Sequence, residues 1–365
     1  MTNLIMTGSV VSLRNTILVG DALEQLRQLP DEYVDTIMTS PPYFNLRDYH
    51  VAGQLGQEAH IDEWVAALAA VARECQRVLA PHGSLWLNLG DAYSAGKRFG
   101  APRKSLLLGP ERVARALITD GWLLRNKIVW AKTNPLPTST RDRLTTAHEY
   151  VYLFVKRASY FFDLDAVRVP LVSTGRRTHT GSRTPARELG RLSGSRDGLL
   201  RLTQEGRSGH PLGKNPGDVW RIGSSSYRAA HFATFPAELV RRPILAGCPP
   251  RVCTRCRAPW RRSTAPIVYH DGVAQSQPFV PCGCSAPTRP GLVLDPFGGS
   301  GTVAEVARSL GRDWLLIELN PEYAELARMR LGICGGRAHR RTGRSTSRRR
   351  GSPMCPGSHG ASHKP

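Results

Sequence analysis

The sequence lacks any apolar run long enough to cross a membrane, and it has few acidic residues for its length. Residues 1–14 contain no charged segment followed by a sustained apolar core, so we expect no secretory signal and a cytoplasmic location. The 29 Asp and Glu are outnumbered by 50 Lys and Arg, which gives a formal net charge of +21. This excess favours a polyanionic partner, although an acidic membrane surface would attract the same charge.

A framework of disulfides is not expected either. Eight cysteines in a chain of 365 residues without an export signal favour free thiols or metal ligands. The arginine-rich end, residues 333–365, contains no acidic residue and has low complexity, so we expect it to be disordered. Part of the positive charge therefore belongs to this tail and not to a folded surface.

The chain does contain alternating strand and helix patterns, with 41% hydrophobic residues to build a core. Short apolar runs that predict buried strands alternate with amphipathic helical patterns, of which residues 61–79 are the longest. This alternation indicates an α/β fold with a doubly wound, mostly parallel sheet. The apolar runs 122–130 and 150–155 are joined by a basic loop, and we expect them to form an antiparallel edge.

The stretch Thr39-Ser-Pro-Pro-Tyr43 follows a run, 34–38, that predicts a buried strand. Two prolines stiffen the loop, because proline fixes φ and has no N–H donor. The Pro41 carbonyl is then held between the hydroxyl of Ser40 and the ring of Tyr43. A planar ring with an exocyclic amine could stack on the tyrosine while its NH₂ group donates to the two oxygens. A proline-rich strand exit with a packing tyrosine explains the pentapeptide equally well.

A second motif, Asp295-Pro-Phe-Gly-Gly-Ser-Gly-Thr302, joins a predicted strand to a predicted helix at 303–310. Glycines at such a turn let backbone N–H groups approach a ligand closely. The third glycine of the dinucleotide-binding fingerprint is missing. The next predicted strand, 314–317, ends in Glu318, at about the spacing where an acid holds ribose hydroxyls.

Together the two motifs resemble those of the amino-methyltransferases of DNA, which use S-adenosylmethionine to methylate cytosine at N4 or adenine at N6. Their order, catalytic first and cofactor second, is similar to that family's β-type arrangement and implies a circularly permuted, Rossmann-like methyltransferase fold. The resemblance implies catalytic roles for Ser40, Pro41, Pro42 and Tyr43. It also implies a cofactor site made of Asp21, Phe235, Pro236, Asp295, Phe297, Gly299, Gly301, Thr302 and Glu318.

In this resemblance the glycine-loop residues hold the methionine end of the cofactor, Glu318 the ribose and Asp21 the adenine amine. Two of the assignments have structural alternatives. Asp21 can cap the helix that it opens. Phe235, which with Pro236 would lie against the cofactor, can instead staple its own helix into the core.

The resemblance assigns residues 15–170 to the catalytic half, and residues 214–247 and 285–332 to the cofactor half. The arginine-rich segment 171–213 lies where the family reads its target sequence. Arginine suits phosphates and guanine edges. A disordered basic linker of the same composition would give only salt-sensitive, nonspecific affinity.

The insertion 248–284 carries two close cysteine pairs about thirty residues apart, Cys253 with Cys256 and Cys282 with Cys284. Such pairs favour a structural zinc knuckle over free thiols, because thiolates can converge tetrahedrally on the metal. The second pair has a single intervening residue, which is tighter than usual, and Cys248 could replace one ligand. The nearby arginines (Arg255, Arg257, Arg261 and Arg262) would give this module a basic face.

A serine at the first position of the Ser-Pro-Pro-Tyr loop resembles the cytosine-N4 members of the family. We therefore predict a site-specific methyltransferase that acts on a cytosine flipped out of double-stranded DNA. The alternatives are adenine-N6 methylation, a small-molecule or RNA methyltransferase, and a non-catalytic zinc-bearing DNA-binding protein. We expect association with the nucleoid, and a cognate restriction endonuclease is a further candidate partner. The sequence leaves the choice between monomer and dimer open.

Overall fold

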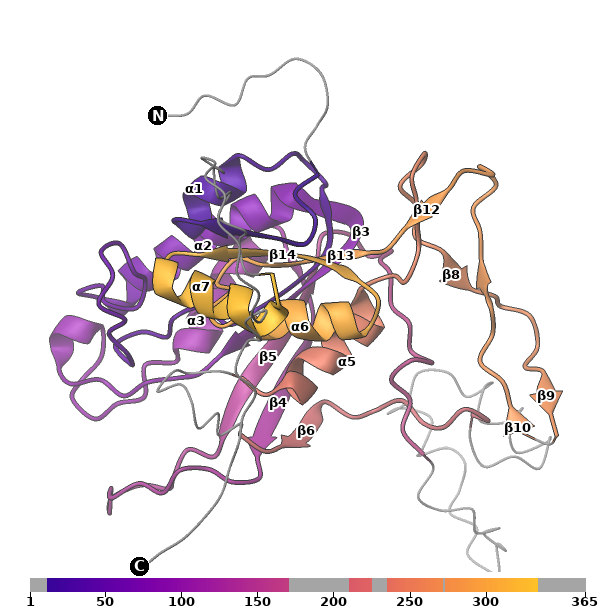
Figure 1. Cartoon of the computed structure of the whole chain (residues 1–365). Helices are drawn as coiled ribbons and strands as arrows, with labels where there is room; N and C mark the ends of the chain where they lie inside the picture. The colour runs from indigo at the N-terminus through magenta and orange to yellow at the C-terminus, as the bar shows by residue number, and fades with distance from the viewer. Residues whose placement is uncertain (1–11, 171–209, 225–234, 272, 334–365) are drawn as a thin grey trace, which may run out of the picture. The chain divides into compact units, whose positions relative to one another are not determined.

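Eight strands form one sheet at the centre of the computed structural model, which describes residues 12–170, 210–224, 235–271 and 273–333 (Figure 1). The chain divides into two units, residues 1–333 and 334–365, and the second lies outside the described residues. From one edge of the sheet to the other, the strands are β1 (Thr16–Val19), β14 (Asp313–Glu318), β13 (Leu292–Asp295), β2 (Val34–Thr39), β3 (Leu79–Leu89), β5 (His148–Val155), β4 (Leu123–Lys132) and β6 (Val219–Ile222).

All of these strands but β5 run in the same direction. Such a sheet is buried on both faces, and its central strands read as continuous apolar runs. In β2 all six residues are buried, and successive side chains enter opposite cores: Ile37 packs on one face and Met38 on the other. The predicted doubly wound, mostly parallel sheet is confirmed.

Helices cover both faces of the sheet (Figure 1). One face packs against α1 (Ala22–Arg27), α2 (Ile61–Val78) and α3 (Gly109–Thr119), which contribute Leu26, Trp64 and Val113 to its core. The opposite face packs against α5 (Ala237–Gly247), α6 (Thr302–Ser309) and α7 (Pro321–Leu331), which contribute Val240, Val303 and Ala324. Within the described residues, no helix is both long enough and apolar enough to span a membrane.

The connections from β13 and from β2 lead to opposite sides of the sheet, so the strand order has a switch point between these two strands. From β13 the chain passes through α6 to β14 on one side, whereas from β2 it passes through α2 to β3 on the other. Such a switch point opens a crevice at the carboxyl ends of the two strands, where ligands of open α/β sheets bind. Both sequence motifs begin at this point.

Two features differ from the predictions. Helix α2 ends at Val78, one residue earlier than the predicted 61–79: Leu79 already pairs with Val34 and begins β3. Strands β4 and β5 are antiparallel as expected, but they are not the edge, because β6 pairs with β4 beyond them. The arginine-rich segment lies outside the described residues up to position 209.

The insertion between α5 and β13 is built from two-residue strands in three small antiparallel ladders (Figure 1). Its pairs are β7 (Val252–Cys253) with β12 (Thr288–Arg289), β8 (Arg261–Arg262) with β11 (Phe279–Val280), and β9 (Tyr269–His270) with β10 (Val273–Ala274).

Candidate active site

The carboxyl ends of four neighbouring strands place the predicted residues in one row. Asp21 follows β1, Glu318 ends β14, Asp295 ends β13 and Ser40 follows β2. Hydrogen-bonded strands lie about 4.8 Å apart, so the three intervals span about 14 Å. A nucleoside cofactor laid across the strand ends would meet these side chains in that order.

A direct hydrogen bond links the two motifs. The hydroxyl of Thr39, which precedes Ser40, donates to Asp295 Oδ1 over 2.7 Å, and both side chains are buried. The same carboxyl oxygen accepts the backbone N–H of Phe297 over 3.0 Å and so shapes the start of the glycine loop. Pro41 and Phe297 line one small cavity beneath the two loops, together with apolar side chains of α2, β3 and α3. The two loops, far apart in the sequence, therefore adjoin.

Two acids at this point have raised pKa values. Burial raises the pKa of Asp295 to about 7, and the nearby charge of Glu318 adds to the effect. Burial also raises the pKa of Glu318, although its oxygens accept the backbone N–H groups of Gly299 over 2.6 Å and Asn320 over 2.8 Å. A carboxylate has about four acceptor positions, so Glu318 can still bind hydroxyl groups.

The glycine loop enters α6 through two residues with positive φ, Gly299 at +50° and Gly301 at +82°. Any side chain at either position would be strained. Thr302, the first helical residue, is buried, and its hydroxyl accepts a hydrogen bond from Arg330 of α7 over 2.9 Å. Its side chain therefore ties α6 to α7, and a cofactor contact by Thr302 stays a prediction.

Asp21 and Phe235 have the structural roles that the sequence offered as alternatives. Asp21 caps α1 by accepting the N–H of Glu24 over 3.0 Å, and it still stands one strand away from Glu318. Phe235 is half-buried against the core under α5 and α6, and Pro236 is the buried residue that precedes α5. Their contacts with a cofactor remain predictions.

The Ser-Pro-Pro-Tyr loop is held by a hydrogen-bond chain that centres on Tyr43. Its hydroxyl lies 3.2 Å from Ser40 Oγ and donates over 2.6 Å to Glu149 Oε2. Burial raises the pKa of the Tyr43 phenol well above its ordinary value, and the charge and hydrogen bond of Glu149 add to this effect. The phenol therefore stays protonated.

Glu149, Lys132 and Asn88 complete this chain, and none of them was among the predicted catalytic or cofactor residues. Lys132 Nζ donates to Glu149 Oε1 over 2.5 Å, and Asn88 Nδ2 donates to Glu149 Oε2 over 3.2 Å. Because β5 is antiparallel to its neighbours, its beginning lies at the edge where β3 and β4 end. The one signal in the sequence was an acid at the start of a strand expected to be antiparallel. Only the strand order shows that this acid lies beside Tyr43.

The four cysteines of the insertion do converge: the sulfur atoms of Cys253, Cys256, Cys282 and Cys284 all lie within 4.8 Å of one another. Cys248 is instead a buried core residue beside α5. Of the arginines predicted to form a basic face, Arg255, Arg257 and Arg261 are exposed and Arg262 is half-buried. Arg257 donates to the Glu32 carbonyl, Arg261 to the Tyr160 carbonyl, and Arg262 forms two hydrogen bonds with Asp163, so these three arginines bind the sheet domain.

The fold and the site together define a class of protein. A parallel sheet with a glycine loop at its switch point, an acid after the next strand and an acceptor-rich proline loop beside it has the arrangement of a methyltransferase that acts on an amine.

The sequence matches a family model described as DNA methylase, which covers both the N6 and the N4 enzymes, over residues 34–329. The chain belongs to this family of DNA methyltransferases, whose methyl donor is S-adenosylmethionine. It is 33% identical over 339 residues to the Type II methyltransferase M.XycI of Xanthomonas campestris pv. cyanopsidis, a match that covers 87% of each chain. It is 34% identical over 337 residues to M.Cfr9I of Citrobacter freundii, again covering 87% of each.

Among solved structures, the PvuII DNA methyltransferase (cytosine-N4-specific) superposes with a TM-score of 0.53 at 22% identity, over 87% of this chain and 86% of that one. A likeness at this level of identity concerns the fold. It agrees with the predicted Rossmann-like methyltransferase architecture.

Proposed function

We propose that this DNA methyltransferase transfers a methyl group to the N4 amine of a cytosine that has been flipped out of a specific site in duplex DNA. The observation that carries the proposal is the pair of acceptors, Ser40 Oγ and the Pro41 carbonyl, at the switch point beside the glycine loop. A base inside a duplex cannot reach such a buried point, so it must leave the stack.

The hydrogen-bond chain orients the proton of Ser40. Tyr43 has one hydroxyl proton, and the short 2.6 Å bond to a carboxylate takes it. The 3.2 Å contact between Ser40 and Tyr43 must then be donated by Ser40. The lone pairs of Ser40 Oγ are thereby left to accept an N–H group from the substrate. Glu149 acts through Tyr43 and is, in this account, a positioning residue.

The chemistry needs such acceptors because an exocyclic amine is a poor nucleophile, with its lone pair delocalised into the ring. Hydrogen bonds from its two N–H groups to Ser40 and Pro41 favour a more tetrahedral nitrogen whose lone pair points out of the ring plane. S-adenosylmethionine supplies an activated methyl group on a sulfonium. The rate gain then comes from alignment and from acceptors that are already in place.

The residues along the strand ends fit the other parts of the cofactor. The backbone N–H groups of the glycine loop and the acid of Asp295 suit the polar methionine end, and Glu318 suits the ribose hydroxyls. Asp21 stands at the far end of the row, where an acceptor for the adenine amine is needed. These assignments extend the family's cofactor use to individual residues of this chain.

The choice of cytosine depends on Ser40, which is similar to the first loop residue of the cytosine-N4 enzymes. Adenine N6 is the alternative base, and a cognate restriction endonuclease would be the expected genetic partner of a site-specific enzyme. Identifying the methylated nucleoside decides between the bases. DNA should be incubated with the protein and radiolabelled S-adenosylmethionine, digested to nucleosides and separated.

We expect the label in N4-methylcytosine. Label only in N6-methyladenine would replace cytosine by adenine in the proposal. DNA binding without any methylated nucleoside, in protein that still binds the cofactor, would favour the non-catalytic DNA-binding alternative. Repeating the assay with RNA and with single-stranded DNA checks that duplex DNA is the preferred substrate.

A further inference from the structure

The insertion has almost no hydrophobic core of its own. Between residues 250 and 289, the buried apolar residues among those described are Val252 and Cys253. Its strands are two residues long, and each pairs with a single partner. A segment of about forty residues with so little buried apolar surface usually needs a metal, a disulfide or a partner to hold its conformation.

The four cysteines are arranged as ligands of one metal ion. All four carry free thiols, and their sulfur atoms lie within 4.8 Å of one another. Zinc–sulfur bonds of about 2.3 Å in a tetrahedron place the sulfurs about 3.8 Å apart, so the cluster needs only a small contraction. Cys253 ends β7 and Cys256 lies in the turn that follows, whereas Cys282 and Cys284 lie between β11 and β12. The metal would therefore join the two ends of the insertion.

The ladder of β7 with β12 also places an arginine, Arg289, against the sheet domain. Thr288 pairs with Cys253 and Arg289 pairs with Val252. Arg289 donates to both carboxyl oxygens of Asp35, over 2.5 and 3.3 Å, and Asp35 is completely buried near the beginning of β2. Asp35 also accepts the N–H of Leu292, the first residue of β13, over 2.8 Å. This carboxylate thus ties together the amino ends of the two strands that carry the catalytic and glycine loops.

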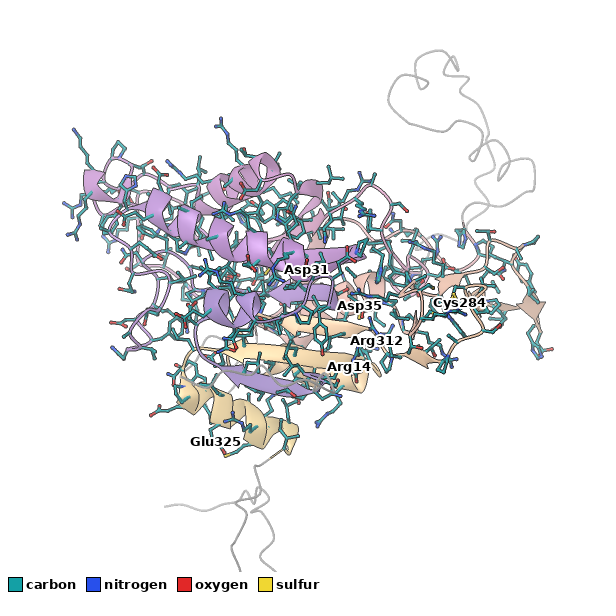
Figure 2. The ribbon with its side chains drawn as sticks, turned by 90° about the horizontal axis from the view of Figure 1, so that it is seen from above. Arg14, Asp31, Asp35, Cys284, Arg312 and Glu325 are labelled. Carbon is teal, nitrogen blue, oxygen red and sulfur yellow. The ribbon has the colours of Figure 1, made fainter. Side chains whose placement is uncertain are left out.

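We propose that Cys253, Cys256, Cys282 and Cys284 bind one zinc ion, and that the zinc-held insertion keeps Arg289 on Asp35 and so fixes strand β2 against strand β13. The metal would be structural, because its ligands lie towards the amino ends of the strands, whereas Ser40 lies at their carboxyl ends. Figure 2 shows Asp35, with Arg312 and Arg14, at the amino ends of the strands, and Cys284 beyond them in the insertion. Arg257 and Arg262 add further ties to the sheet domain.

Metal analysis of the full-length protein tests the site. The protein, purified without added metal or chelator, should contain one zinc per chain. Cys256→Ser and Cys284→Ser should each lower this content at least about tenfold and lower Tm by at least about 5 °C. Cys355→Ser is the matched control, because Cys355 is not one of the four converging cysteines; it should retain zinc and Tm. Protein without zinc, or with a disulfide among these four cysteines, would overturn the metal site.

A second variant distinguishes the contribution of the Arg289–Asp35 ion pair from that of the metal. Arg289→Gln should retain one zinc per chain, yet lower Tm by a substantial part of what removing the zinc with a chelator does. Chelation should then lower the Tm of this variant by less than it lowers that of the unaltered protein, because the Arg289–Asp35 tie is already broken. If the losses of Tm from Arg289→Gln and from chelation were additive, the proposed link between the zinc and the Arg289–Asp35 ion pair would be wrong, while the zinc site itself would stand. These readouts are metal content and unfolding, so they do not depend on which base is methylated.

Discussion

Replacing Ser40 by alanine should lower the rate of methyl transfer about 10²–10³-fold and leave the Kd for S-adenosylmethionine within about twofold. The magnitude is that of removing one preorganised hydrogen-bonding group from a reacting centre. Ser40 follows β2 and bonds to Tyr43, whereas the glycine loop is shaped by Asp295 and Thr39. The cofactor side should therefore survive the change. Single-turnover assays with radiolabelled cofactor measure the rate, and calorimetry measures the Kd.

Tyr43→Ala extends this test, because it removes both the aromatic face and the acceptor for the Ser40 proton. We expect a loss of transfer at least as large as that of Ser40→Ala, again with the cofactor Kd little changed. Ser105→Ala, at a serine whose hydroxyl bonds only to a neighbouring carbonyl on the surface, serves as a control. If the loop variants lost cofactor binding and transfer together, these residues would have a structural role and not the proposed catalytic one.

Glu149→Ala should lower kcat by about 10²-fold with a change in the cofactor Kd of less than about twofold. The variant removes the acceptor of the Tyr43 proton and leaves Lys132 without the carboxylate that it contacts at 2.5 Å. The Tyr43 proton then has only Asn88 Oδ1, 3.1 Å away, and Ser40 as acceptors, so the orientation of the serine hydroxyl is no longer fixed. A misplacement of about 1 Å at a reacting centre can cost about 10²-fold in rate.

Two further variants distinguish positioning from loss of stability. Glu149→Gln keeps an acceptor oxygen for Tyr43 and should recover most of the rate. In Tyr43→Phe the hydroxyl is absent, so adding Glu149→Ala should lower the rate little further. Glu111→Ala, which breaks a comparable ion pair with Lys127 elsewhere on the sheet domain, is the matched control and should leave kcat unchanged. Equal losses in Glu149→Ala and Glu111→Ala would contradict the positioning role.

The sequence predicted the parts of the site that lie on continuous motifs. Two prolines after a buried strand and glycines before a helix are local signals, because they restrict or free the backbone at particular residues. The alternation of strands and helices was sufficient for the fold class. The resemblance to a permuted family assigned the two loops to one enzyme site, and the pairing of β2 with β13 and the hydrogen bond between Thr39 and Asp295 agree with it.

Groups that reach the site through the order of the strands were not predictable in this way. Glu149 is separated from Tyr43 by 106 residues, and its place depends on the reversal of β5. Arg289 and Asp35 are 254 residues apart, and their ion pair depends on how the insertion docks against the sheet domain. The arginines of the insertion were predicted to give it a basic face. Three of them also bind carbonyls and a carboxylate of the sheet domain, contacts that no local sequence pattern indicates.

The proline loop and the glycine loop should act as one site at the switch point of the sheet. A crystal structure of the protein with S-adenosylhomocysteine and target DNA would show whether they do. We expect the cofactor sulfur between Gly299 and Pro41, with a flipped cytosine that contacts Ser40 Oγ and the ring of Tyr43. A cofactor bound away from the glycine loop, or a target base without contact to Ser40 and Pro41, would contradict it.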